Sequence, residues 1–204
     1  ELVVRGYLMT NLAEGLNGLG PLDADRALAV SGLLTSALFG VLHASNPNAT
    51  AVSTLNIAVV GVFFAVTYAL TERLGVAIGL HLTWNWSVGS LYGLPVSGIT
   101  TGGSILAIEE RGPDWATGGP FGPEAGVVVL IALAVATVLL VWWVRRQYGT
   151  VTLREAVAVP ALRIDAGDGR PDDGDARTDD VSASGGTDGA VSDTATADTP
   201  NRDG

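Results

Sequence analysis

The sequence predicts an all-α protein, namely a polytopic transmembrane helical bundle with a disordered acidic C-terminal tail. Hydrophobic residues make up 48% of the 204 residues and charged residues only 16%, whereas soluble domains usually carry about a quarter charged residues. Residues 165–204 hold eleven Asp and three Arg, a net charge of −8. Residues 1–164 hold ten acidic and eight basic residues, a net charge of −2, which completes the −10 of the whole chain. The acidity therefore belongs to the tail, and the body is apolar and nearly neutral.

Four apolar stretches each predict a membrane-spanning helix: residues 27–44, 53–71, 74–93 and 125–144. A helix needs about 20 apolar residues to cross a hydrocarbon core of about 30 Å. The last stretch meets this length unaided, and the others come close. Inside lipid every backbone amide must find its partner within the protein, which favours helices. Four such stretches in one chain argue against the alternative of buried helices in a soluble protein.

The segments around these stretches predict the remaining organisation. Residues 1–12 are typical of the end of a further helix, and the polar, Gly-rich segment 14–25 predicts a loop or an interfacial stretch. We expect residues 1–148 to form the C-terminal part of a helical membrane domain and residues 149–164 a juxtamembrane basic segment. Residues 165–204 lack apolar periodicity and cannot bury enough surface to offset their ordering entropy, so we expect them to be disordered.

The distribution of Arg and Trp predicts the orientation in the membrane. Trp142 and Trp143 end the last apolar stretch, and Arg145 and Arg146 follow at once. Tryptophan gathers at membrane interfaces and positive charge at the cytoplasmic side. The C-terminal end is therefore expected in the cytoplasm, with the Gly- and Pro-rich segment 94–124 on the outer side.

The composition excludes several functional classes. Every one of the eleven basic residues is Arg, and this Lys-free, Asp-rich chain is typical of a halophilic archaeon, although a GC-rich genome would also favour Arg. The acidic balance argues against nucleic-acid binding. The absence of Cys excludes disulfides, thiolate nucleophiles and Cys metal ligands.

The candidate chemical groups form three pairs at a spacing of four residues. The only two His of the chain both lie in apolar stretches, where an ionisable group usually faces the interior of the bundle or a wet cavity. A spacing of four residues places two side chains on one helix face. The pairs are Glu1 with Arg5, Phe39 with His43, and His81 with Asn85.

These pairs resemble the three motifs of the CPBP family, the CAAX-prenyl-endopeptidase and bacteriocin-processing group of intramembrane proteases. The family shows Glu-Glu-x-x-x-Arg, Phe-x-x-x-His and His-x-x-x-Asn or Asp in this order. Here they read ELVVRG, FGVLH and HLTWN, with one motif-free apolar stretch between the last two. The resemblance covers residues 1–93 and more loosely extends to residue 144. The run EERG at residues 109–112 has the wrong spacing and loop-like surroundings, so we exclude it.

The resemblance implies an endopeptidase that hydrolyses peptide bonds with a glutamate-activated water. Glu1 matches the second Glu of the first motif, so the first, water-activating Glu is expected just before it, in a chain truncated at its N-terminus. His43 would act with that Glu on the water. His81 and Asn85 would donate hydrogen bonds to the developing oxyanion.

The supporting roles and the metal question also follow from the resemblance. Glu1 would hold Arg5, and Phe39 would orient His43. No cofactor is expected on the favoured metal-free mechanism. In a zinc-dependent alternative His43 and His81 would be the ligands, but Asn is a poor zinc ligand.

We expect a multi-pass protein of the cell membrane whose partners are the lipid bilayer and a peptide or protein substrate in or at the membrane. Two alternatives remain open. A catalytically inactive family member would serve as a membrane scaffold or immunity protein. A transporter would line its pathway with His and Asn, but it should also carry polar residues along 53–71 and 125–144, where few occur.

Overall fold

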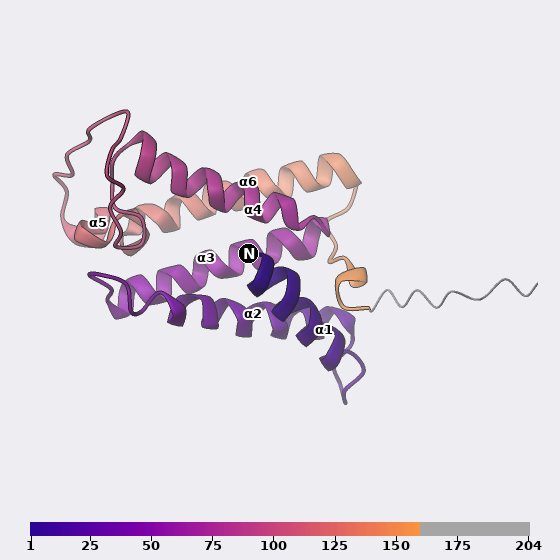
Figure 1. The fold of residues 1–204 in the computed structure, drawn as a ribbon. Helices are drawn as coiled ribbons and strands as arrows, with labels where there is room; N and C mark the ends of the chain where they lie inside the picture. Colours follow the sequence, from indigo (N-terminus) through magenta and orange to yellow (C-terminus); the bar gives the residue numbers. More distant parts are fainter. Residues whose placement is uncertain (160–204) are drawn as a thin grey trace, which may run out of the picture. The chain divides into compact units, whose positions relative to one another are not determined.

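The computed structural model describes residues 1–159 of the chain (Figure 1). Within these residues every regular element is a helix and no strand occurs, which confirms the all-α prediction. The tail predicted to be disordered, 165–204, lies outside the described residues, as does the end of the predicted juxtamembrane segment 149–164.

Three long α-helices and several shorter pieces make up the bundle, and the pieces written η are π-helical (η1, η2) or 3₁₀-helical (η3–η5). In chain order they are η1 (Leu2–Met9), α1 (Thr10–Leu16), α2 (Ala24–Leu42), α3 (Ala51–Thr71), α4 (Leu74–Asn85), η2 (Trp86–Leu91), α5 (Asp114–Thr117), η3 (Gly119–Phe121), η4 (Pro123–Ala125), α6 (Val127–Tyr148) and η5 (Glu155–Val157).

Side chains cap the starts of α2 and α3. The Asp23 carboxylate accepts a hydrogen bond from the backbone N–H of Arg26 at 2.9 Å, so α2 begins before the uncharged stretch that predicted it. Thr50 and Ser53 cap α3 reciprocally, each side-chain oxygen accepting from the backbone N–H of the other. A cap of this kind contributes about 1 kcal/mol to helix stability.

Three helices are long and apolar enough to cross a membrane: α2 with 19 residues, α3 with 21 and α6 with 22. They correspond to three of the four predicted spans. The fourth, 74–93, is also helical as far as Leu91, but at Trp86 it changes from α4 to π-helical η2, so neither piece has the full length alone. The wider turn shows in the bond from Tyr92 N–H to Ser87 C=O, five residues back.

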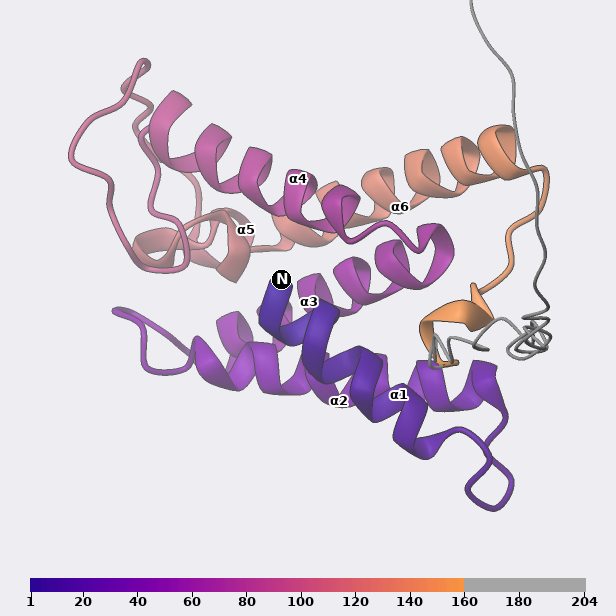
Figure 2. The same cartoon turned by 45° about the vertical axis from the view of Figure 1, so that its right-hand side comes forward.

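The first helical segment lies within the bundle rather than beside it. η1 packs against α2, α3 and α4, and the start of the chain lies next to the middle of α2 and α3 in both views (Figures 1 and 2). The α2–α3 connection and the long segment after η2 lie at one end of these helices, and the α3–α4 turn and residues 149–159 lie at the other (Figure 2). The side chains of η1 therefore reach the centre of the bundle.

Small residues let α2 and α3 approach closely. A Cβ on Gly40 would lie 2.6 Å from the carbonyl oxygen of Thr54, so only glycine fits at this contact. Buried hydroxyls of the two helices bond to carbonyls of their own helix, as Ser36 does to Gly32 at 2.6 Å and Thr71 to Thr67 at 2.7 Å. Membrane helices commonly associate through small residues of this kind.

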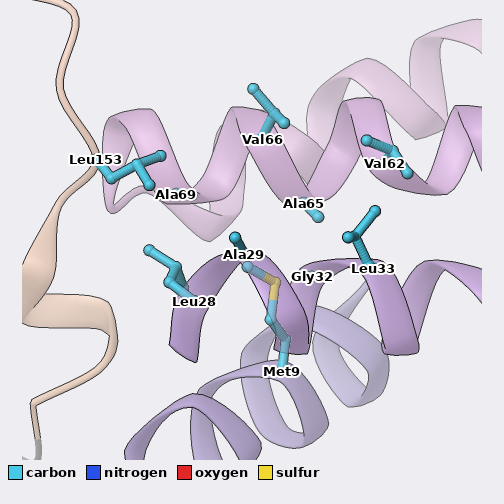
Figure 3. A pocket seen from close by; sticks show the side chains of 10 residues that line it. All are labelled: Met9, Leu28, Ala29, Gly32, Leu33, Val62, Ala65, Val66, Ala69 and Leu153. Atoms are coloured by element: carbon cyan, nitrogen blue, oxygen red, sulfur yellow. The ribbon is translucent and has the colours of Figure 1, made fainter. Parts of the chain in front are cut away.

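An apolar cavity of about 230 Å³ lies between η1, α2, α3 and the segment after α6 (Figure 3). Met9, Gly32, Ala65 and Leu153 are among its lining residues, and none of the lining side chains is ionisable. This cavity therefore holds none of the candidate site residues.

Candidate active site

Arg5 is the central charge of the candidate site. It is 0% exposed, and η1 directs it between α2 and α3. Its Nη2 donates to the backbone carbonyl of Gly61 at 2.7 Å, and its Nε lies 3.3 Å from Glu1 Oε2. The guanidinium carbon lies 4.6 Å from the centre of the Phe39 ring. A buried charge is tolerated only when it is paired and hydrogen-bonded, and here both conditions are met.

Glu1 joins two of the predicted motifs. Its carboxylate, 3% exposed, pairs with Arg5 through the spacing of four residues. The same carboxylate accepts a hydrogen bond from His81 Nδ1 at 3.0 Å. This second contact joins residues 80 positions apart, and no local spacing signals it. Both hydrogen bonds reach Oε1, from Arg5 Nη1 at 3.4 Å and from His81, while Oε2 lies 3.3 Å from Arg5 Nε in the ion pair.

His43 has a defined tautomer in this structure. It follows the last residue of α2, and its Nδ1 lies 2.7 Å from the backbone carbonyl oxygen of Phe39. A carbonyl oxygen only accepts hydrogen bonds, so Nδ1 carries the proton. In the neutral ring Nε2 therefore has a free lone pair, as a general base requires.

Phe39 lies against both imidazoles. Its ring centre is 4.6 Å from that of His43 and 5.8 Å from that of His81. The two histidines therefore share one site, although His43 ends its helix and His81 lies within α4. Phe39 itself is only 7% exposed, a position consistent with packing rather than chemistry.

His81 and Asn85 line an open cleft of about 370 Å³. Glu1 contributes to the same cleft, whose other walls are the apolar side chains of Leu2, Val3, Ile78 and Leu82. Within residues 1–159 the side-chain amide of Asn85 makes no hydrogen bond. Asn85 is therefore free to donate to a molecule in the cleft.

The motif-free helix α3 also supplies the site, which the sequence did not reveal. Gly61 provides the carbonyl that receives Arg5, and the Phe64 ring stacks on His81 with centres 4.9 Å apart and planes 19° apart. An apolar ring and a backbone oxygen in an apolar helix carry no sequence signal of function. The packing of α3 alone reveals them.

A further acidic residue missed by the sequence reasoning is Glu124, in η4. It is 2% exposed, and its carboxylate accepts from Trp84 Nε1 at 2.9 Å and from the Ser97 N–H at 3.4 Å. Burial raises the pKa of Glu124, and the two hydrogen bonds and the nearby charge of His43 partly oppose this rise. The segment 94–124 was expected to be an extramembrane or partly re-entrant loop, and nothing in that pattern distinguishes its last residue. By contrast, Glu109 and Arg111 are exposed and pair with each other at 2.8 Å.

The described residues do not assemble a zinc site. Among residues 1–159 no three His, Asp, Glu or Cys side chains come close enough together to hold one ion. Structural and catalytic zinc sites use at least three protein ligands.

Gly61 offers a test of the Arg5 site. A Cβ at residue 61 would lie 2.8 Å from Arg5 Nη2 and 3.1 Å from Ser36. Gly61→Ala should displace the guanidinium and lower the unfolding temperature in detergent by several degrees, as expected for a destabilisation of about 1–3 kcal/mol from overpacking. Gly75→Ala is the matched control, because a Cβ there meets no atom within 4 Å. Equal unfolding temperatures for the two variants would contradict the placement of Arg5.

Comparison with known proteins identifies the region that bears the site. Residues 1–87 match the family described as Type II CAAX prenyl endopeptidase Rce1-like, which confirms the resemblance drawn from the three motifs. The matched range includes every predicted site residue from Glu1 to Asn85, and Glu124 lies beyond it. No curated protein and no solved structure matches the chain.

Proposed function

We propose that this chain, which carries an Rce1-like domain over residues 1–87, is an intramembrane endopeptidase that hydrolyses peptide bonds with a water activated by His43. The observation that most supports this proposal is the convergence of the two histidines on Phe39. His43 presents a free ring nitrogen, and His81 lies in a cleft beside Asn85. Hydrolysis by water requires a base that activates the water and hydrogen-bond donors that stabilise the oxyanion.

His43 is the base with a defined role. Its Nε2 removes a proton from water while the water oxygen bonds to the carbonyl carbon of the peptide. Arg5 and His81 both hold the Glu1 carboxylate. Glu1 is therefore an orienting group.

The oxyanion formed by this addition is held by His81 and Asn85. His81 is oriented by its hydrogen bond to Glu1 and lines the cleft where the oxyanion forms. Asn85 donates through its side-chain amide. The C–N bond then breaks, and His43 returns its proton to the leaving amine, which balances the reaction.

The surroundings of the cleft indicate the class of substrate. Apolar side chains surround the polar groups, and α2, α3 and α6 have membrane length. A peptide segment with apolar side chains at membrane depth fits these walls. The family description names CAAX prenyl proteins, and a prenylated C-terminus is one member of this class. The exposed Trp142 and the Arg pair at the end of α6 support a cytoplasmic position for the C-terminal side in this proposal.

The proposal is tested with the natural gene product in detergent and a quenched-fluorescent peptide library. We expect cleavage by the wild-type protein, none by His81→Ala, and unchanged cleavage with a zinc chelator. Loss of activity with the chelator, restored by added zinc, would establish the metal-dependent alternative. A folded wild-type protein that cleaves no peptide would replace the proposal with a scaffold, immunity or transport role.

Asn85 provides the sharpest mutation in the cleft. Asn85→Ala should lower kcat about 100-fold while KM changes less than about threefold, because an oxyanion donor acts mainly in the transition state. The matched control is Thr83→Ala, an exposed residue two positions away that does not line the cleft. A rise in KM with unchanged kcat would instead assign Asn85 to substrate binding.

A further inference from the structure

Glu124 is a buried carboxylate with no role in the mechanism above. It lies just before α6 and outside the range that matches the family. A carboxylate buried to this degree is costly unless hydrogen bonds compensate for its lost hydration. Trp84 and Ser97 supply two such bonds. A polar isostere or an apolar residue would avoid that cost, so the carboxylate calls for a functional reason.

The segment that carries Glu124 is docked onto the site. Phe121 belongs to the same buried cluster as Phe39 and Val4, and Ala125 packs against this cluster. The side-chain amide of Asn56 on α3 donates to the Gly126 carbonyl at 3.3 Å. The position of Glu124 is therefore tied to the helix faces that bear His43 and Arg5.

The hydrogen bond from Trp84 connects Glu124 to α4, the helix that carries the proposed oxyanion donors. Trp84 lies between His81 and Asn85 on α4, one residue before Asn85. Its indole N–H donates to Glu124 Oε1 at 2.9 Å. Rotation of α4 about its axis would break this bond and turn His81 and Asn85 away together. The hydrogen bond to Glu124 thus fixes the rotation of α4 about its axis, and with it the direction of His81 and Asn85.

Backbone geometry holds the acceptor site in place. Gly122 has φ +104°, and a Cβ there would lie 2.0 Å from the Pro95 carbonyl oxygen and 3.1 Å from Glu124 Oε2. Gly98 N–H donates to the Phe121 carbonyl at 2.6 Å. These close approaches between the two parts of the segment after η2 leave the carboxylate little freedom.

The charge of Glu124 also acts on the base side. Glu124 belongs to the segment whose Phe121 packs against Phe39, and the Phe39 ring centre lies 4.6 Å from that of His43. A positive charge on His43 favours the ionised form of Glu124, and the interaction is reciprocal, so an ionised Glu124 would stabilise the imidazolium formed when His43 takes the proton from water. A neutral group of the same shape would keep a hydrogen bond to Trp84 but lose this effect.

On the premise of the peptidase function proposed above, we propose that Glu124 is a positioning residue that holds α4 through Trp84 and places a negative charge beside His43.

The test compares four proteins in the peptide-cleavage assay: wild type, Glu124→Gln, Glu124→Asp and Trp84→Phe. Glu124→Gln keeps an acceptor for Trp84 but removes the charge, and should lower kcat about 10-fold with KM within about twofold. Glu124→Asp restores the charge and should recover part of the loss. Trp84→Phe removes the hydrogen bond and keeps the charge, and should lower kcat by a smaller factor.

The unfolding temperature distinguishes a positioning role of Glu124 from a contribution to stability alone. Because burial raises the pKa of Glu124, the folded protein loses stability as the pH rises through that pKa and the group ionises. Glu124→Gln should therefore unfold at the same or a higher temperature than wild type at pH 7, despite its lower kcat.

If the wild-type protein is active, two outcomes would overturn the proposed role of Glu124. The first is an unchanged kcat in Glu124→Gln. The second is a lower kcat that Glu124→Asp does not recover, together with a lower unfolding temperature. The second would show a structural role only. A folded wild-type protein without any cleavage would overturn the peptidase function and this proposal together, so the two failures are distinguishable.

Discussion

Replacing His43 by alanine is expected to lower kcat/KM for peptide cleavage by about 10²–10⁴-fold, the contribution typical of a general base. His43 has a basic nitrogen that its own hydrogen bond leaves available, because Nδ1 is bonded to the Phe39 carbonyl. His81 directs its Nδ1 to Glu1 and is proposed to act as a donor. Steady-state kinetics on one cleaved peptide measure this effect.

His43→Asn is the matched control for this substitution. The Asn amide can donate to the Phe39 carbonyl as Nδ1 does, but it has no basic nitrogen. It should fold as wild type, with the same circular dichroism and unfolding temperature, and be as inactive as His43→Ala. If His43→Asn retained more than about a tenth of the wild-type kcat/KM, the bond to Phe39 would be the function of His43, and the base would be another group.

Replacing Arg5 by methionine should lower the free energy of unfolding by about 3–5 kcal/mol, the usual effect of removing one partner of a buried ion pair. Glu1 would lose its ion-pair partner, and the Gly61 carbonyl would lose its donor inside the bundle. The position of His81 would change as well, because Glu1 holds it. Cleavage should therefore be lost together with stability, as measured by chemical unfolding in detergent beside the activity assay.

Arg5→Lys tests whether a positive charge at this position is sufficient or whether the planar guanidinium is also needed. Lysine keeps the positive charge but lacks the planar fork that reaches Glu1 and Gly61 simultaneously, so an intermediate loss is expected. Arg26→Met is the matched surface control, because the side chain of Arg26 is 65% exposed and its ion pair with Asp23 is 3.7 Å long. It should change stability by less than about 1 kcal/mol. Similar losses at positions 5 and 26 would contradict a central role for Arg5.

Local patterns explain what the sequence could predict. Uninterrupted apolar stretches predicted α2, α3 and α6, and the four-residue spacings placed Phe39 beside His43 and Glu1 beside Arg5. These features depend on residues within a few positions of one another. The change to a π-helix at Trp86 was not predicted, because the apolar pattern of 74–93 is the same for an α-helix and a π-helix.

Tertiary packing explains the rest. The contact between Glu1 and His81 spans 80 positions, and the stacking of Phe64 on His81 depends on how α3 lies against α4. Glu124 became recognisable only because a Gly-rich segment folds back onto Phe39. Such contacts have no periodicity that a single sequence could display.

The spacing of Glu1 and Arg5 has a consequence for biogenesis. An arginine at the centre of a newly inserted helix costs about 2.5–3.5 kcal/mol during translocation into the bilayer. One helical turn suffices to bring the opposite charge of Glu1 to Arg5, so this ion pair can form before α2, α3 and α4 are made. His81 leaves the ribosome later and joins a pair already formed. The charges of Glu1 and Arg5 can therefore pair with each other during synthesis. The proposed active site is complete only after α4, which carries His81 and Asn85, has been made.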